Sequence, residues 1–131
     1  MVKSVYLHDL ITDNFAEIPP DMTPRSIGRA KDCDIVLSPT FTCISRLQIA
    51  VQYFPYGDIL LTQKSSNCDT FYGPSEEDLD NLYYNQSENI LPGYLIRFKG
   101  GYDLKLLSFK DKLVQERLQS RNEDTEIINL S

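Results

Sequence analysis

The sequence predicts an all-β fold in which two sheets pack as a sandwich, and three observations support this. Most of the chain consists of short apolar runs separated by residues typical of turns. One run, residues 47–53, alternates apolar and polar side chains, as a half-buried strand does. With 131 residues, 41% of them hydrophobic, the chain is long enough for one domain with its own core and too short for two of ordinary size.

The expected strands form a regular series along the chain. Val5–Leu7 and Phe15–Ile18 flank Thr12-Asp13-Asn14, an arrangement typical of a hairpin. In residues 47–53 the apolar side chains share one face, and the alternation places Gln48 on the outer face at the start of the strand. The other strand candidates are Ile35–Leu37, Ile59–Leu61, Thr70–Tyr72, Tyr94–Phe98 and Tyr102–Leu107.

Two segments depart from this rhythm. Ser75, followed directly by acidic residues, resembles a capping box and predicts one or two helical turns over Glu76–Leu82. We expect residues 1–108 to form the sandwich and residues 109–119 a short helix packed on it. The polar residues 120–131 are expected to be a flexible tail or linker. The stripe predicted to pack on the sandwich consists of Phe109, Leu113, Val114 and Leu118.

Composition argues against several classes of function. The formal net charge of -6 disfavours direct nucleic-acid binding and attachment to an acidic membrane. Three cysteines and one histidine, with no metal-ligand spacing, predict neither a metal site nor a disulfide framework and suit a reducing, intracellular compartment. No cofactor is expected. Because no motif pairs a nucleophile with His8 and no glycine-rich phosphate loop opens a helix, we do not expect an enzyme, although a catalytic domain such as a kinase could be fused outside this chain.

The cations of the first half of the chain are few and lie in or beside turn-rich segments. They are Arg25, Arg29, Lys31, Arg46 and Lys64, together with Lys3 near the start. An acidic protein whose loops gather a few cations can form a small basic pocket, which favours a compact anion over a long polyanion.

Four motifs, in order and with compatible spacing, resemble the forkhead-associated (FHA) domain family. The resemblance covers about residues 4 to 108. A Gly-Arg pair at a strand end is followed by a short strand, a serine-containing loop, a Ser-Asn loop and a closing Gly-containing segment. The motifs are Ser26-Ile27-Gly28-Arg29, Ile44-Ser45-Arg46, Ser65-Ser66-Asn67 with Thr70-Phe71-Tyr72-Gly73, and Leu91-Pro92-Gly93-Tyr94-Leu95-Ile96.

The resemblance implies an eleven-stranded sandwich of two antiparallel or mixed sheets that binds phosphothreonine peptides through loops at one end. It implies that the fork of donors on Arg29 meets the phosphate and that the Ser45 hydroxyl donates to a phosphate oxygen. Asn67 would hold the peptide backbone beside the phosphate. The further expected binding residues are Ser66 beside the phosphothreonine, Arg46 beyond it, Lys64 at the rim, and Gln48.

The chain departs from the family pattern at three places, one of which, Gly93-Tyr94 in place of the closing Gly-Asp, concerns the fold more than the ligand. Gln48 stands where the family usually has a histidine that orders the loop by hydrogen bonds. The usual Asn-Gly pair is Asn67-Cys68, followed by Asp69, which brings a negative charge toward the supposed phosphate site. Because glycine there relieves a positive φ angle, Cys68 predicts a reshaped turn, and it is the cysteine expected to be exposed enough to react.

The leading hypothesis is a non-catalytic phosphothreonine-reading module that mediates protein–protein interaction. By resemblance its host is a nuclear protein of DNA-damage, meiotic or cell-cycle signalling. The alternative is a degenerate FHA domain that serves as a phospho-independent assembly or dimerisation scaffold, motivated by Gln48, Cys68 and Asp69. Separately, Ile127, Ile128 and Leu130 beside acidic residues are similar to SUMO-interacting motifs. A SUMO contact is one interpretation of this segment, and an ordinary linker is the one that we favour.

Overall fold

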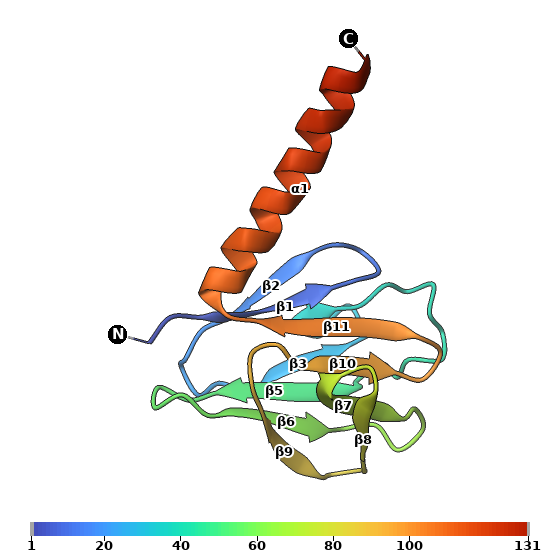
Figure 1. The fold of residues 1–131 in the computed structure, drawn as a ribbon. Helices are drawn as coiled ribbons and strands as arrows, with labels where there is room; N and C mark the ends of the chain where they lie inside the picture. Colours follow the sequence, from blue (N-terminus) through green and yellow to red (C-terminus); the bar gives the residue numbers. More distant parts are fainter. Residues whose placement is uncertain (1, 131) are drawn as a thin grey trace.

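Two β-sheets lie face to face, and one helix projects from the end of the sandwich (Figure 1). The structure is a computed structural model that describes residues 2–130, with side chains described up to Gln119. The six-stranded sheet has the order β2-β1-β11-β10-β7-β8, and the five-stranded sheet has the order β4-β3-β5-β6-β9. The predicted all-β sandwich of eleven strands with a C-terminal helix is therefore confirmed.

The strands are short, as the spacing of apolar runs predicts. All but one of their pairings are antiparallel; β3 and β4 pair in parallel, so the five-stranded sheet is mixed. The elements are β1 (Val5–Asp9), β2 (Phe15–Ile18), β3 (Arg25–Gly28), β4 (Ile35–Val36), β5 (Ile49–Tyr53), β6 (Ile59–Gln63), β7 (Thr70–Ser75), β8 (Asp78–Leu82), β9 (Ser87–Ile90), β10 (Leu95–Phe98), β11 (Tyr102–Leu107) and α1 (Phe109–Leu130).

The core lies between the two sheets and consists mostly of branched aliphatic side chains. Alternate residues of the strands face inward; in β5 and β6 the first, third and fifth residues are buried. Two large aromatic side chains, Phe98 and Tyr102, are fully buried among them. This core holds the strand ends in place, so the loops between them start from defined positions.

Residues 76–82 do not form the expected helical turns. Instead β7 and β8 form an antiparallel hairpin in which Phe71 lies opposite Asn81, with an irregularity between Tyr72 and Ser75. A capping-box pattern is a local signal, and pairing with a neighbouring strand overrides it here. The strand β9 is also absent from the sequence expectations, because Ile90 is the only apolar residue in it.

Helix α1 begins at Phe109 and packs only its first turns on the sandwich. Phe109 and Leu113 are half-buried there, whereas Val114 and Leu118 are 51% and 47% exposed. The prediction that all four side chains pack on the sandwich is therefore wrong for the last two. The boundary at residue 119 and the flexible tail 120–131 stay predictions, although the helix itself extends to Leu130.

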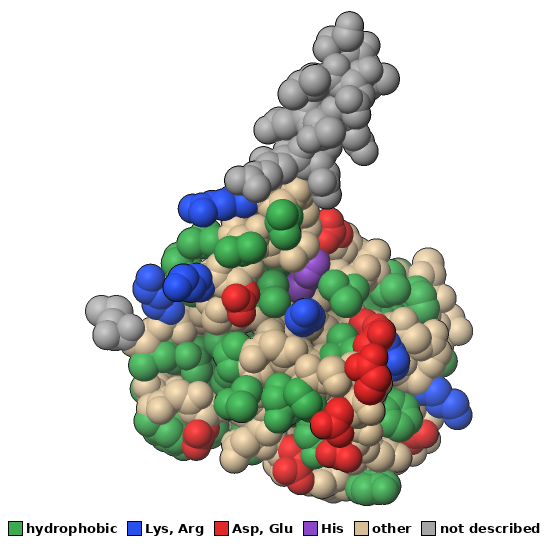
Figure 2. All heavy atoms as spheres, viewed as in Figure 1, with side chains coloured by type: hydrophobic (Ala, Val, Ile, Leu, Met, Phe, Trp, Pro, Cys, Tyr) green, Lys and Arg blue, Asp and Glu red, His purple; other side chains and the backbone are tan. Residues whose placement is uncertain are grey.

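The two ends of the sandwich carry different features (Figure 1). The β3–β4, β4–β5 and β6–β7 loops lie together at one end, and α1 and the start of β1 lie at the other. The acidic residues of the β7–β8 hairpin, among them Glu76, Asp78 and Asp80, are exposed, and Figure 2 shows acidic side chains gathered on that part of the surface. The residues of the predicted SUMO contact have side chains outside the described part of the chain.

Candidate functional site

The β3–β4, β4–β5 and β6–β7 loops, at one end of the sandwich, surround a solvent-open pocket of about 460 Å³. Three cationic side chains and no carboxylate are among the residues that line it, although the whole chain carries a formal charge of -6. Such a pocket attracts a compact anion. Its lining residues are Arg29, Thr42, Cys43, Ile44, Ser45, Arg46, Leu47, Lys64, Ser65, Ser66 and Asn67.

The floor of the pocket depends on Gly28, the last residue of β3. The β4–β5 loop crosses directly above it, so a Cβ atom at Gly28 would lie 2.1 Å from the backbone oxygen of Arg46. Two backbone hydrogen bonds hold the β4–β5 loop against the residues after Gly28. Arg29 N donates to Ser45 O and Ala30 N donates to Arg46 O, both at 3.1 Å. Only glycine leaves room for this approach.

The Arg29 side chain lines the pocket and is anchored through its Nε. Its Nε donates to the backbone oxygen of Ile44 at 3.0 Å, and the side chain is half-buried. Among the described residues no acceptor is recorded for either terminal nitrogen of this guanidinium. The planar fork is thus oriented in advance and keeps donors for an anion.

Gln48 ties the β4–β5 loop to the β6–β7 loop from inside the protein. Its Oε1 accepts from Ser45 N at 2.9 Å, and its Nε2 donates to Cys68 O and to Thr70 Oγ1, both at 2.9 Å. The side chain is fully buried, so the expected position on the outer face is wrong. The alternation fails because β5 begins only at Ile49, and the backbone before it turns over Gly28.

Ser65 organises the β6–β7 loop, a role that the sequence reasoning missed. Its Oγ accepts from Asn67 N and Cys68 N, both at 3.1 Å, and hydrogen-bonds the Ser45 hydroxyl. Gln63 Nε2 supports the same loop by donating to Ser65 O at 3.0 Å and Cys68 O at 2.8 Å. A serine that precedes a polar turn after a strand is the signal that would have found it.

Solved structures resemble this fold closely, although no protein-family model and no curated protein sequence matches the chain. The FHA domain of human APLF, in complex with an XRCC1 bisphospho peptide, has a TM-score of 0.66 at 21% identity and covers 81% of this chain and 99% of its own. The N-terminal FHA domain of S. cerevisiae Rad53, in complex with a phosphothreonine peptide, has a TM-score of 0.66 at 16% identity. The match covers 86% of this chain and 98% of the Rad53 domain chain. Mycobacterium tuberculosis EmbR, in complex with a low affinity phosphopeptide, has a TM-score of 0.61 at 18% identity and covers 81% of this chain and 24% of that chain.

The chain has the FHA fold. The fold resemblance suggested by the four sequence motifs is therefore confirmed, and the motifs can be placed on the FHA framework. The Gly-Arg motif lies at the end of β3, the two serine-containing motifs lie in the β4–β5 and β6–β7 loops, and the closing motif leads into β10. Three motifs thus converge on one end, and the fourth closes the sandwich at the other.

On this FHA framework, six of the seven predicted binding residues line one pocket. Gln48 does not line it, and it acts on the pocket through its hydrogen bonds to both loops. Ligand contact by the other six stays a prediction. Those six are Arg29, Ser45, Arg46, Lys64, Ser66 and Asn67.

The altered β6–β7 turn leaves the pocket open. Among the described residues positive φ angles occur at three non-glycine positions, none of them in the turn, so Cys68 needs no special backbone conformation. Cys68 is buried, which corrects the expected exposure, and burial raises the pKa of its thiol. Cys43 is the exposed cysteine in the pocket. Asp69 does not line the pocket, and its backbone oxygen accepts from Lys99 N at 3.0 Å.

Two other kinds of site are missing from the part of the chain that the structure describes. It contains no group of three or more His, Cys, Asp or Glu side chains placed to hold a metal ion. Within the same residues no helix has both the length and the apolar character required to cross a membrane.

Proposed function

We propose that this FHA domain is a non-catalytic module that binds phosphothreonine in a partner protein and thereby mediates a reversible protein–protein interaction. The observation that carries the proposal is the pocket with three cations and no lining carboxylate, in which the Arg29 side chain is anchored by its bond to Ile44 O. A phosphate has nearly two negative charges and several acceptor oxygens at neutral pH, so it matches this donor set.

Each neighbouring side chain has a distinct part in the proposal. The Ser45 hydroxyl, already oriented by Ser65, donates to a phosphate oxygen. Ser66 and Asn67 are exposed on the opposite loop and hold the peptide beside the phosphate. Arg46 and Lys64 are exposed at the rim and strengthen the attraction.

The resemblance also suggests where such a module acts. We propose a host in DNA-damage, meiotic or cell-cycle signalling and a nuclear location. The named similar structures include the FHA domains of human APLF and S. cerevisiae Rad53, but also bacterial EmbR. The location is tested by imaging a fluorescent fusion of the full-length host protein in its own cells.

The phospho-independent scaffold is less favoured by the side chains at this site. The three departures that motivated it do not disturb the pocket, because Gln48 keeps both loops joined, Cys68 is buried and Asp69 does not line the pocket.

The proposal is tested with a degenerate phosphothreonine peptide library, followed by titration calorimetry on the best peptide and its unphosphorylated form. We expect saturable binding of the phosphorylated peptide alone. Because hydrogen bonds to charged groups contribute about 1.5 to 3 kcal/mol, Arg29→Ala should weaken it roughly 10- to 100-fold. Binding should also weaken below about pH 6, where the phosphate loses one charge.

Arg117→Ala is the matched control, because Arg117 is exposed on α1 at the other end of the sandwich. It should leave the peptide affinity unchanged. Equal affinity for phosphorylated and unphosphorylated peptides would overturn the proposal, as would an Arg29→Ala variant that folds and binds like the unaltered chain.

A further inference from the structure

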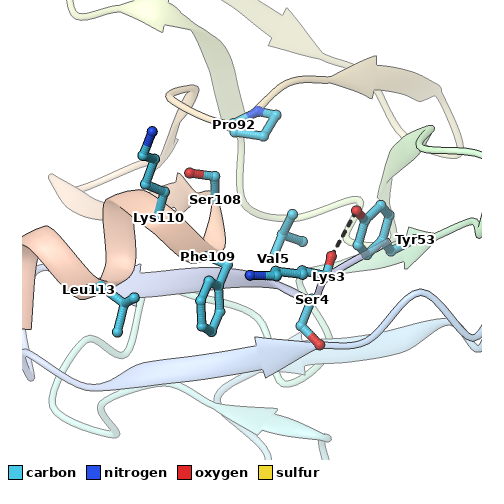
Figure 3. Close-up of a pocket in the computed structure, with 9 residues that line it drawn as sticks. All are labelled: Lys3, Ser4, Val5, Tyr53, Pro92, Ser108, Phe109, Lys110 and Leu113. Atoms are coloured by element: carbon cyan, nitrogen blue, oxygen red, sulfur yellow. Dashed lines mark hydrogen bonds between the residues drawn. The ribbon is translucent and has the colours of Figure 1, made fainter. Parts of the chain in front are cut away.

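A second concave surface lies at the opposite end of the sandwich, where α1 leaves it. This helix-base groove has a volume of about 500 Å³ and lies between the first turns of α1 on one side and β5 and the β9–β10 loop on the other (Figure 3). Its walls are mainly apolar and come from Val5, Tyr53, Pro92, Phe109 and Leu113. The Tyr53 hydroxyl donates to Lys3 O at 3.0 Å, so this polar group of the groove wall already has a partner.

The rim of the helix-base groove is basic. Lys3 and Lys110 both line it and are both exposed, and no carboxylate is among the lining residues. The Lys3 ammonium lies 4.3 Å from the centre of the Phe109 ring, so the charge stands directly beside the apolar wall. An apolar groove with a cationic rim is complementary to a peptide segment in which aliphatic side chains fill the groove and neighbouring acidic side chains face the lysines.

The chain itself contains a segment of that kind. Residues 123–130 carry three acidic residues and no cation, together with three large aliphatic residues. We call it the acidic–aliphatic segment. Its side chains lie outside the described part of the structure, so only its sequence and its place in α1 are used. Its acidic members are Glu123, Asp124 and Glu126, and its aliphatic members are Ile127, Ile128 and Leu130.

The segment belongs to the same helix as the groove but lies far along it. Phe109 and Ile127 are 18 residues apart within α1. At about 1.5 Å per residue in a helix, that separation is about 27 Å. The segment of one helical α1 therefore cannot reach the groove of its own copy, and only a second copy could bring it there.

The charges of α1 favour an antiparallel arrangement of two copies. Residues 109–121 contain four cations and two acids, whereas residues 122–130 contain three acids and no cation. Antiparallel helices would place each basic half against the acidic half of the other copy. The exposed Val114 and Leu118 are four residues apart, so they share a helix face and provide an apolar seam between the halves.

We propose that the helix-base groove is a self-association site that takes the acidic–aliphatic segment of a second copy of this chain, with the two α1 helices antiparallel. The contact is isologous, so each copy offers one groove and one segment, and the association closes at a dimer. It lies at the end opposite the phosphate pocket and does not depend on the proposed phosphothreonine binding.

The test is sedimentation velocity of the full chain over a range of concentrations, with two charge-reversed variants. One carries Lys3→Glu and Lys110→Glu in the groove, and the other carries Glu123→Lys, Asp124→Lys and Glu126→Lys in the segment. The unaltered chain should dimerise, and each variant alone should have a dimer dissociation constant raised roughly tenfold or more, since several ion pairs of about 0.2 to 1 kcal/mol become repulsive. An equimolar mixture of the two variants should form a heterodimer, because both grooves then meet segments of opposite charge.

Lys105→Glu is the matched control, because Lys105 is an exposed lysine on β11 outside the groove. It should dimerise like the unaltered chain, and so should Arg29→Ala, which separates this proposal from phosphopeptide binding. A chain that stays monomeric at millimolar concentration would overturn the proposal. So would groove variants that dimerise normally, a mixture that stays monomeric, or an equal loss of dimer in Lys105→Glu.

Discussion

Gln48 illustrates how one side chain supports the phosphate pocket without lining it. It occupies the position where the FHA family usually has histidine, and its amide both donates and accepts, as a loop-ordering group at this place must. Three hydrogen bonds link it to Ser45, Cys68 and Thr70. The sequence showed the replacement, but the burial that makes these bonds strong arises from the backbone turn over Gly28.

We predict that Gln48→Leu destabilises the protein and opens the pocket. Leucine leaves buried partners such as Ser45 N and Cys68 O without their hydrogen bonds, so the free energy of unfolding should fall by about 2 to 4 kcal/mol. Urea denaturation measures this. Gln52→Leu, in the adjacent strand β5 and only half-buried, is the control and should cost much less; equal losses would contradict the interpretation.

At the scale of elements, a reciprocal contact between Ser26 in β3 and Asp34 just before β4 closes the loop that contains Arg29. The Asp34 carboxylate accepts from Ser26 N at 2.8 Å and from Ser26 Oγ at 3.1 Å, while Ser26 Oγ accepts from Asp34 N at 2.9 Å. These hydrogen bonds, first from the backbone and then from the hydroxyl, lower the pKa of Asp34 below its ordinary value of 3.8. Acidic turn residues thus have a definite structural role here.

We predict that Asp34 titrates below 3.8 in the folded protein. Because its folded-state pKa is lowered, the ionised carboxylate stabilises the fold above the unfolded-state pKa, and this stabilisation is lost as the pH falls through the folded-state pKa. Carboxyl carbon shifts measured by NMR over an acid titration report the midpoint. Ser26→Ala removes one donor and should raise the Asp34 midpoint; an unchanged midpoint in this variant would contradict the role of the hydroxyl.

At the scale of the whole molecule, the buried Tyr102 hydroxyl joins parts that are distant in sequence. It donates to Asp9 Oδ2 at the end of β1 and accepts from Ser38 N, at 2.9 Å, in the β4–β5 loop. The other oxygen of Asp9 accepts from Ile11 N and Thr12 N. Burial and the bond to Asp9 raise the pKa of Tyr102, so its hydroxyl remains protonated. The pocket loop is thereby anchored to the six-stranded sheet.

We predict that Tyr102→Phe lowers the free energy of unfolding by about 1 to 3 kcal/mol, because the buried Asp9 carboxylate and Ser38 N each lose a partner. Urea denaturation at neutral pH provides the measurement. Tyr56→Phe removes the same hydroxyl from a side chain that is 72% exposed and should change stability by less than about 0.5 kcal/mol. Similar effects of the two substitutions would show that the buried network contributes nothing.

The sequence by itself determined the sandwich class, most of its strands and the motifs of the pocket, because turn chemistry, alternation and motif order are local properties of the chain. It failed at β8 and at Gln48, where pairing with β7 and the turn over Gly28 override local pattern. Only the tertiary structure decided that six predicted residues from three loops share one pocket and that Asp69 does not line it. The physical reason is that such convergence depends on how the two sheets pack, and no local spacing encodes that packing.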